Sequence, residues 1–226
     1  IATMKKFGVD VEIKAPYKKY IIPEQNYKST TLIIPSDFSS LALLLAATVL
    51  LGDDVTIKAS TGSMPQADEA IIDILEKMGV VITLNKNIIK IKSPKKLDGG
   101  KFDLSDSPDL VPAVAILALK ASNPIEIFNA EHVRLKETDR LSIIARELSK
   151  LGIKIEEKKD GLILDNSDNL SSADLNSEND HRLFMAFCIA GMYVGNCTIS
   201  DPESVEVSYP NFISEMKRLG CKIFLD

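Results

Sequence analysis

The chain has no tryptophan, two histidines and three cysteines among its 226 residues. The cysteines, Cys188, Cys197 and Cys221, show no C-x-x-C spacing and lie in apolar stretches. So few nitrogen and sulfur ligands argue against a structural zinc site. We therefore expect reduced thiols in the core, with neither a metal nor a cofactor. The longest apolar run, Leu41–Leu51, is interrupted by Thr48 and is too short to cross a bilayer, so no membrane partner is expected.

Basic residues are also fewer than acidic residues. There are 27 Lys and Arg residues against 32 Asp and Glu residues, which gives a net charge of −5. A general nucleic-acid binder is usually basic, so no nucleic-acid partner is expected. The first residues lack the pattern of a signal or transit segment, and we expect a monomeric cytoplasmic protein. Any anion must be bound by a local cluster of cations.

An aspartate followed by an apolar helix occurs three times along the chain. The three segments begin at Asp37, Asp109 and Asp180, and the spacings are 109 − 37 = 72 and 180 − 109 = 71. Self-similarity at a fixed period indicates a repeated structural unit. The first helix of each unit is apolar nearly all round and should be buried.

A glycine that ends a helix and precedes a strand recurs out of phase with these aspartates. Glycine just past the last turn supplies the left-handed residue that stops a helix. It stands at Gly79, Gly152 and Gly220, and once more at Gly8, with 79 − 8 = 71. We therefore interpret residues 1–14 as the last helix and strand of a preceding domain or crossover. Residues 15–226 would form a C-terminal domain with repeats at about 31–92, 100–164 and 171–226.

Each complete unit is predicted to contain a strand, a helix, a strand, a helix and a hairpin. In the second unit the predicted elements are Gly100–Leu104, Asp109–Ala121, Ile125–Phe128, Glu137–Leu151, Ile153–Glu157 and Leu162–Leu164. The fold class is α/β, or α+β in stricter schemes. We expect three βαβαββ units around a pseudo-threefold axis, with helices inside and sheets outside.

The polar residues collect at the predicted helix starts. Asp37 is interpreted as a helix cap, and Ser36, Ser107 and Asn179 also suit cap positions. If the units are related by rotation, these starts face one end of the domain. Free backbone N–H groups and the helix dipole make such starts suitable for phosphates and carboxylates.

The stretch from His132 to Arg140 crowds three cations around an acid. Lys136, Glu137 and Arg140 lie at the predicted start of an amphipathic helix. We expect them to form one pocket together with Asp109, His181, Arg182 and Arg134. Arginine suits carboxylates and phosphates because of its two-pronged geometry. For Arg134 and Asp139 an alternative stays open, in which they pair with each other or with neighbours and shape the loop.

These residues resemble the enolpyruvyl transferase family, in particular its members that act on shikimate 3-phosphate. Arg134-Leu-Lys-Glu-Thr-Asp-Arg140 resembles the R-x-K-E-[ST]-D-R signature, and Asp180-His-Arg-Leu-Phe-Met-Ala186 resembles D-H-R-x-x-M-A. Similar segments begin at Ser36 and Asp201. The resemblance implies two domains of three βαβαββ units, with helix starts from both facing a cleft. It also implies transfer of the enolpyruvyl group of phosphoenolpyruvate to the 5-hydroxyl of shikimate 3-phosphate, with release of phosphate.

The resemblance assigns roles residue by residue. Asp109 matches a carboxylate that contacts the shikimate hydroxyls and accepts a proton. Glu137 matches the acid that protonates the enol carbon and later removes a proton. The remaining matches are binding residues: His132 and Lys136 for shikimate 3-phosphate, and Arg140, Arg182 and His181 for phosphoenolpyruvate.

Two departures from the family pattern qualify these roles. Val207 stands where many members carry a lysine, so one phosphoenolpyruvate contact is missing or is made by another residue. The residues that the family supplies from its other domain are not in this chain, so we expect the chain alone to be inactive. Three alternatives are a transferase acting on UDP-N-acetylglucosamine, an RNA terminal-phosphate cyclase, and a non-catalytic binding module on the same scaffold. The charge signature disfavours the first, and the signature and the acidic charge disfavour the second.

Overall fold

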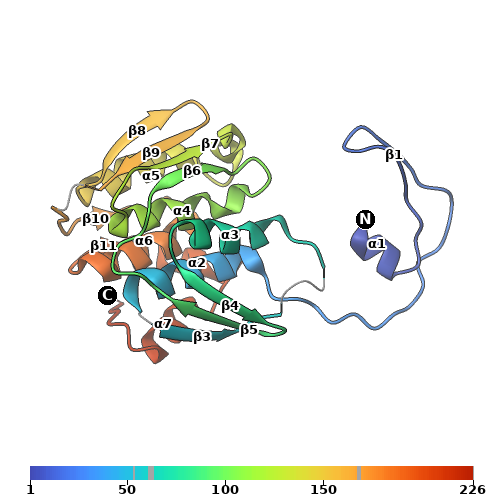
Figure 1. The fold of residues 1–226 in the computed structure, drawn as a ribbon, viewed down its shortest axis with the longest axis horizontal. Coiled ribbons are helices and arrows are strands. Elements are labelled where there is room, and N and C mark those ends of the chain that lie inside the picture. Colours follow the sequence, from blue (N-terminus) through green and yellow to red (C-terminus); the bar gives the residue numbers. More distant parts are fainter. Residues whose placement is uncertain (53, 61–63, 167–168, 226) are drawn as a thin grey trace.

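The computed structural model describes residues 1–52, 54–60, 64–166 and 169–225. Its core is built around three helices, α2 (Phe38–Leu51), α4 (Val111–Ile116) and α6 (His181–Val194), which contact one another (Figure 1). The side chains of α4 are all buried, and so are most of those of α2 and α6. This confirms the prediction that the apolar first helix of each unit is buried.

The helical stretch predicted over Asp109–Ala121 has three parts. The 3₁₀ turns η2 (Pro108–Leu110) and η3 (Leu117–Lys120) flank α4. Pro112 stands in the first turn of α4, where its missing N–H leaves no intrahelical bond unmade. The stretch therefore runs almost as predicted.

The second unit has the complete predicted order of elements. Strands β6 (Gly100–Asp103), β7 (Ile125–Phe128), β8 (Lys154–Lys158) and β9 (Gly161–Asp165) form a sheet in the order β6-β7-β9-β8. β6 and β7 are parallel, and β9 is antiparallel to both β7 and β8. The parallel pair is connected through α4, as a crossover requires. The predicted strand bounds hold to within one residue.

The other two units have fewer strands than predicted. In the first, β3 (Asp54–Lys58), β4 (Val81–Asn85) and β5 (Ile88–Lys92) form an antiparallel sheet in the order β3-β5-β4. Among its described residues the third has the parallel pair β10 (Asp174–Leu175) and β11 (Thr198–Ile199) and no further strand. Within the described ranges, no strand lies in residues 22–37 or 200–225. A strand requires a partner for its backbone groups, and Ile33 and Ile34 stay exposed where the first one was expected.

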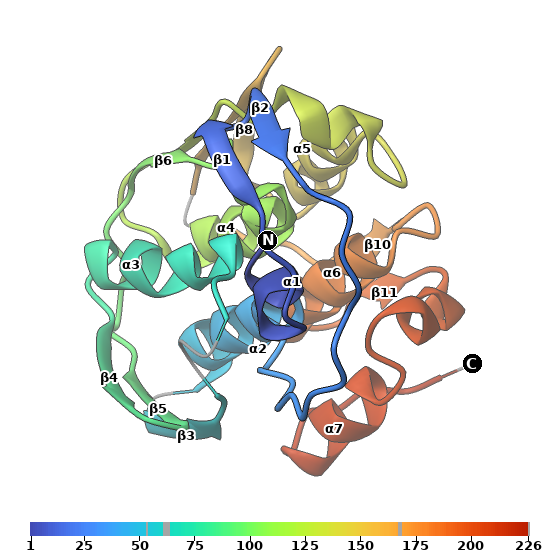
Figure 2. The ribbon, with the colours of Figure 1, turned by 90° about the vertical axis from the view of Figure 1, so that its right-hand side faces the viewer.

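The second helices lie around the central three (Figure 2). They are α3 (Ala70–Lys77), preceded by the 3₁₀ turn η1 (Ala67–Glu69); α5 (Arg140–Lys150), preceded by η4 (Glu131–Leu135); and α7 (Phe212–Arg218), which follows η5 (Pro202–Val207). Each ends before a glycine with positive φ, namely Gly79, Gly152 and Gly220. The glycine rule thus located these helix ends correctly. No helix among the described residues is long and apolar enough to cross a membrane.

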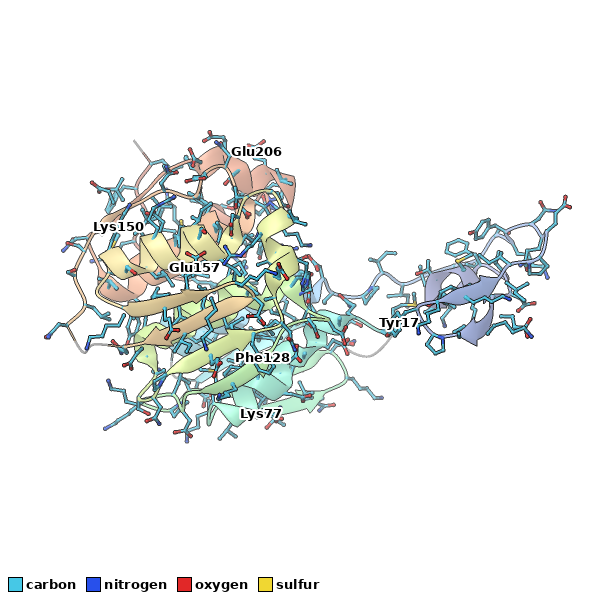
Figure 3. The ribbon with its side chains drawn as sticks, turned by 90° about the horizontal axis from the view of Figure 1, so that it is seen from above. Tyr17, Lys77, Phe128, Lys150, Glu157 and Glu206 are labelled. Atoms are coloured by element: carbon cyan, nitrogen blue, oxygen red, sulfur yellow. The ribbon has the colours of Figure 1, made fainter. Side chains whose placement is uncertain are left out.

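The N-terminal segment stands apart from this body (Figures 1 and 3). Helix α1 (Ala2–Lys6) precedes Gly8, which has a φ of 78°, and β1 (Glu12–Ala15) pairs with β2 (Lys19–Ile21). The boundary predicted after residue 14 therefore falls inside a hairpin. The division into domains itself stays a prediction.

Candidate functional site

Aspartates cap α2 and α6, and the start of α6 carries two of the predicted site residues. The Asp37 carboxylate accepts the N–H groups of Ser39 and Ser40 at the start of α2. Asp180 does the same for Arg182 and Leu183 at the start of α6. Asp37 is thus confirmed as a cap, whereas the preceding Ser36 and Asn179 lie outside their helices. The cap at Asp180 places His181 and Arg182 in the first turn of α6.

The second helix of the second unit begins three residues later than predicted. α5 starts at Arg140, and Asp139 is its cap, accepting the N–H of Ser142 at 3.1 Å. Lys136 and Glu137 therefore lie in the bend between η4 and α5 rather than in the first helical turn. The prediction of a helix from Glu137 was wrong because a chain of polar residues offered several possible caps, and Asp139 is the one used.

Arg140 lies at the centre of the cluster and has no exposed surface. Its Nε is 2.7 Å from Asp180 Oδ2, its Nη1 is 2.9 Å from Asp109 Oδ1, and its Nη2 is 2.7 Å from Glu137 Oε2. A buried guanidinium requires such partners, because an unpaired buried charge is costly. A ligand could contact Arg140 only if Glu137 or Asp109 moved aside.

Three further contacts join the remaining side chains to this centre. Lys136 Nζ is 3.3 Å from Asp109 Oδ1, and Arg182 Nη2 is 3.4 Å from Asp109 Oδ2. His181 Nδ1 is 3.8 Å from Glu137 Oε1. The structure thus brings together six of the seven residues to which the resemblance assigns a role, drawn from three helix starts. They form an array of three cations, two carboxylates and one histidine.

In the described part of the chain, two buried side-chain polar atoms have no hydrogen-bond partner: Ser204 Oγ, and Nη1 of Arg182 at the site. The side chain of Arg182 is 11% exposed. Buried polar groups are normally paired, so each exception calls for an explanation. A guanidinium nitrogen with a free N–H at a helix start suits an oxygen of a carboxylate or phosphate.

The charges shift the pKa values of the two groups they surround. Burial alone would raise the pKa of Asp109, but Arg182, Arg140 and Lys136 outweigh it and hold that pKa below its usual value. Burial lowers the pKa of His181, and Arg182 and Arg140 lower it further against the opposing effect of Asp180 and Glu137. Asp109 is therefore held as a carboxylate and His181 as a neutral imidazole at neutral pH.

His132 is the predicted site residue that the structure does not bring to the cluster. It lies in η4 and lines a surface hollow with Asn129, Arg134 and Leu135. Among the described residues, no ion pair or hydrogen bond connects it to the other six. Val207, at the end of η5, is 74% exposed and leaves room for a larger side chain.

Two residues beside the cluster, Asp68 and Thr138, were not predicted from the sequence. The hydroxyl of Ser39 donates to the carboxylate of Asp68. Burial raises the pKa of Asp68, which lies close enough to Asp109 and Arg182 to feel their charges. The repeat could have indicated Asp68, because it lies at the start of the second helix of the first unit, as the 136–140 stretch does in the second unit. Thr138 was also missed; its hydroxyl donates to Asp180 at 3.2 Å.

Arg134 does not join the pocket, contrary to the expectation that it would surround the ligand. Its Nη1 lies 2.9 Å from Asp139 Oδ2 and 2.7 Å from Glu157 Oε1. The alternative in which Arg134 pairs with Asp139 and shapes the loop is therefore the one observed. No group of three or more His, Cys, Asp or Glu side chains that could hold a metal is found in the described part of the chain.

Comparison with known proteins gives this array of charges its context. The model of the EPSP synthase (3-phosphoshikimate 1-carboxyvinyltransferase) family matches residues 1–216. The chain belongs to the EPSP synthase family. Its charged signatures and its α/β fold are thus those of a family member, as the resemblance implied.

Individual EPSP synthase relatives extend well beyond this chain. The 3-phosphoshikimate 1-carboxyvinyltransferase of Nitrosopumilus maritimus is 62% identical over 223 residues, which are 99% of this chain and 53% of the relative. That of Methanococcus vannielii is 43% identical over 229 residues, again 53% of its length. An EPSP synthase structure from Acinetobacter baumannii superimposes with a TM-score of 0.81 at 25% identity, covering 96% of this chain and 53% of that one. The chain spans about half the length of the relatives it matches.

Proposed function

We propose that the full-length protein transfers the enolpyruvyl group of phosphoenolpyruvate to the 5-hydroxyl of shikimate 3-phosphate and releases phosphate. This is 3-phosphoshikimate 1-carboxyvinyltransferase activity, a step of aromatic amino acid biosynthesis. The observation that carries the proposal is the array in which Lys136, Arg140 and Arg182 surround Asp109 and Glu137 at three helix starts. Both proposed substrates are multiply charged anions that such an array would bind.

The proposed chemistry divides the cluster into proton-transfer and binding groups. In the first step Glu137 gives a proton to the methylene carbon of phosphoenolpyruvate while the 5-hydroxyl attacks the neighbouring carbon and Asp109 accepts the hydroxyl proton. In the second step the C–O bond to phosphate breaks, the leaving phosphate takes the proton held by Asp109, and Glu137 takes a proton back from the new methyl group. General acid–base catalysis of this kind requires an acid and a base placed near the new bond. The fixed cations would stabilise the charge that develops on the intermediate.

The remaining roles concern binding. We assign Lys136 and His132 to shikimate 3-phosphate, and Arg140, Arg182 and His181 to phosphoenolpyruvate. The free Nη1 of Arg182 supports its assignment, since it needs an acceptor. Phosphoenolpyruvate would reach the buried Arg140 after displacing Glu137, whose side chain is 45% exposed and can move. This displacement would also bring Glu137 toward the substrate.

The proposal extends to the assembly around the site. We place the three units about a pseudo-threefold axis, supported by the mutual contacts of α2, α4 and α6. An N-terminal domain would close the cleft from the other side and is the main partner. The protein would act as a cytoplasmic monomer without a cofactor. The 226 residues alone would then show no turnover.

The test is phosphate release by the full-length protein from phosphoenolpyruvate and shikimate 3-phosphate. Glu137→Gln and Arg140→Ala should each reduce the rate by at least about 100-fold, the scale of a lost acid–base or electrostatic group. Arg218→Ala is the matched control, because Arg218 is an exposed α7 residue paired with Glu215. No release by the wild type, or full activity of Glu137→Gln, would reject the proposal.

A further inference from the structure

Arg134 has every nitrogen of its guanidinium bonded to the protein. Nε donates to the backbone oxygen of Lys159 at 2.9 Å, and Nη2 donates to that of Lys158 at 2.6 Å. Nη1 contacts the carboxylates of Asp139 and Glu157. Nη1 also donates to Ser142 Oγ at 3.2 Å, so three nitrogens are directed at five residues and use the full planar fork of arginine.

These acceptors belong to two different layers of the fold, the outer sheet and the helices. Lys158 and Lys159 lie at the end of β8 and in the turn that leads to β9, in the outer sheet. Glu157 also belongs to β8 (Figure 3). Asp139 caps α5 in the helical layer. Arg134 therefore joins the outer sheet to the start of α5, through a side chain that is 21% exposed.

The backbone held in this way carries two site residues. Arg134 is in η4, and Lys136 and Glu137 follow it directly in the bend that ends at the Asp139 cap. Lys136 N–H makes a long 3.4 Å bond to the Val133 oxygen, and the Asp139 oxygen accepts the N–H of Ile143 at 3.1 Å, but among the described residues no backbone hydrogen bond is made by Glu137 or Thr138. The bend thus has little internal support. Side-chain contacts hold it instead: Thr138 donates to Asp180, and Glu137 pairs with Arg140. Arg134 is the side chain that ties the bend to the outer sheet, through Asp139.

Direct binding of an anion by Arg134 does not fit these contacts. Its guanidinium already pairs with two carboxylates, and each of its three nitrogens donates to a protein oxygen. A phosphate would have to displace Asp139 from a helix cap. Arg182, with a free nitrogen, contrasts with this arrangement.

We infer that Arg134 is a positioning residue, which holds the 135–139 bend so that Lys136 and Glu137 face Asp109 and Arg140, and that Glu157 acts through it from the outer sheet. This inference rests on the proposed function for its kinetic consequence. Misplacement of a catalytic group by about 1 Å costs up to roughly 100-fold in rate. A lysine could not replace Arg134, because one ammonium cannot bond both backbone oxygens and both carboxylates.

The experiment is a double-mutant cycle on the full-length enzyme with Arg134→Ala and Glu157→Ala, assayed by phosphate release. Arg134→Ala should lower kcat by about 10- to 100-fold, and Arg134→Lys should recover little of it. Glu157→Ala should lower kcat a few-fold in the wild type and not at all when Arg134 is already alanine. A role in stability alone would leave kcat per folded molecule unchanged. Independent multiplicative losses, or kcat unchanged in Arg134→Ala, would overturn the inference.

Hydrogen exchange keeps the test independent of the activity. The amides of residues 135–142 should exchange faster in Arg134→Ala, while those of α4 and α6 keep their wild-type rates. The exposed-arginine variant Arg218→Ala should leave residues 135–142 unchanged. Unaltered exchange at 135–142 in Arg134→Ala would overturn the inference. A wild type that releases no phosphate would reject only the proposed function.

Discussion

The carboxylate of Asp180 binds Arg140 and caps α6 at the same time. Its Oδ2 is 2.7 Å from Arg140 Nε and its Oδ1 is 3.2 Å from Arg140 Nη2, while Oδ1 also accepts the N–H of Arg182 at 2.9 Å. Neither side chain has exposed surface. One carboxylate thus fixes the starts of α5 and α6 relative to each other, and with them the spacing of Arg140 and Arg182.

Removal of this carboxylate should destabilise the protein strongly. Asp180→Ala leaves the buried Arg140 short of a partner and α6 without its cap, and such a change costs about 3–5 kcal/mol. Asp180→Asn keeps a cap acceptor and should lose less. Urea unfolding of the full-length protein measures both. Asp37→Ala is the control, since it removes a cap alone, worth about 1 kcal/mol. Equal losses in Asp180→Ala and Asp37→Ala would show that the buried ion pair adds nothing.

Glu147 should make stability depend on pH in the acid range. The side chain is 1% exposed, and its carboxylate lies 2.6 Å from both Arg146 Nε and Lys150 Nζ. Burial would raise the pKa of Glu147, but Lys150, Arg146 and the Asn176 N–H outweigh it and lower that pKa below 4.5. The stability that Glu147 adds is therefore present above about pH 4.5 and is lost as the pH falls through the lowered value.

The comparison of wild type with Glu147→Gln checks this sign. The difference in free energy of unfolding should be largest near pH 7 and should shrink as the pH falls below about 4.5. Glu76→Gln removes an exposed carboxylate of α3 and should leave the acid slope unchanged. A difference that grows on acidification would contradict the prediction.

Periodic features of the chain were predictable from sequence. The Asp-led helices and the glycine helix ends gave the second unit almost completely, because both reflect local rules of capping and burial. Local sequence could not show whether the strand expected before α2 forms. Whether residues 30–34 form a strand depends on a partner strand, and sequence alone does not say which neighbour is present.

Side-chain direction was less predictable than position. The composition of the 132–140 stretch indicated an anion site, and six of seven chosen residues do meet. The sequence could not distinguish Arg134, which faces the outer sheet, from Arg140, which faces the core. That choice depends on the end of β8 and the turn to β9, whose acceptors lie 24 and 25 residues after Arg134. Asp68 was missed for a similar reason, since the site charges that it lies near, Asp109 and Arg182, come from other units.

His181 should titrate below the usual histidine value of 6.5 in the ligand-free protein. Burial is the main cause, and the charges of Arg182 and Arg140 add to it. The folded state therefore binds this proton less readily than the unfolded chain, so stability falls as the pH drops below 6.5 toward the lowered value. A titration of the imidazole signals by NMR, assigned with His181→Gln, measures the midpoint. Arg182→Gln should move it upward, and a midpoint at or above 6.5 in the wild type would refute the prediction.

Val207→Lys should strengthen phosphoenolpyruvate binding in the full-length protein. Val207 is 74% exposed at the end of η5, so a lysine fits without displacing core atoms. The resemblance drawn from the sequence predicts that a lysine is common at this position in the family, and one added charge-assisted hydrogen bond contributes about 1.5–3 kcal/mol. We expect KM for phosphoenolpyruvate to fall by about 10-fold, since 1.4 kcal/mol corresponds to that factor. Glu206→Gln raises the net charge by the same single unit one residue earlier on η5, without adding an ammonium, and controls for a general gain of positive charge. A fall in KM of equal size in both variants would trace the effect to net charge, and an unchanged KM in Val207→Lys would mean that another residue already makes this contact.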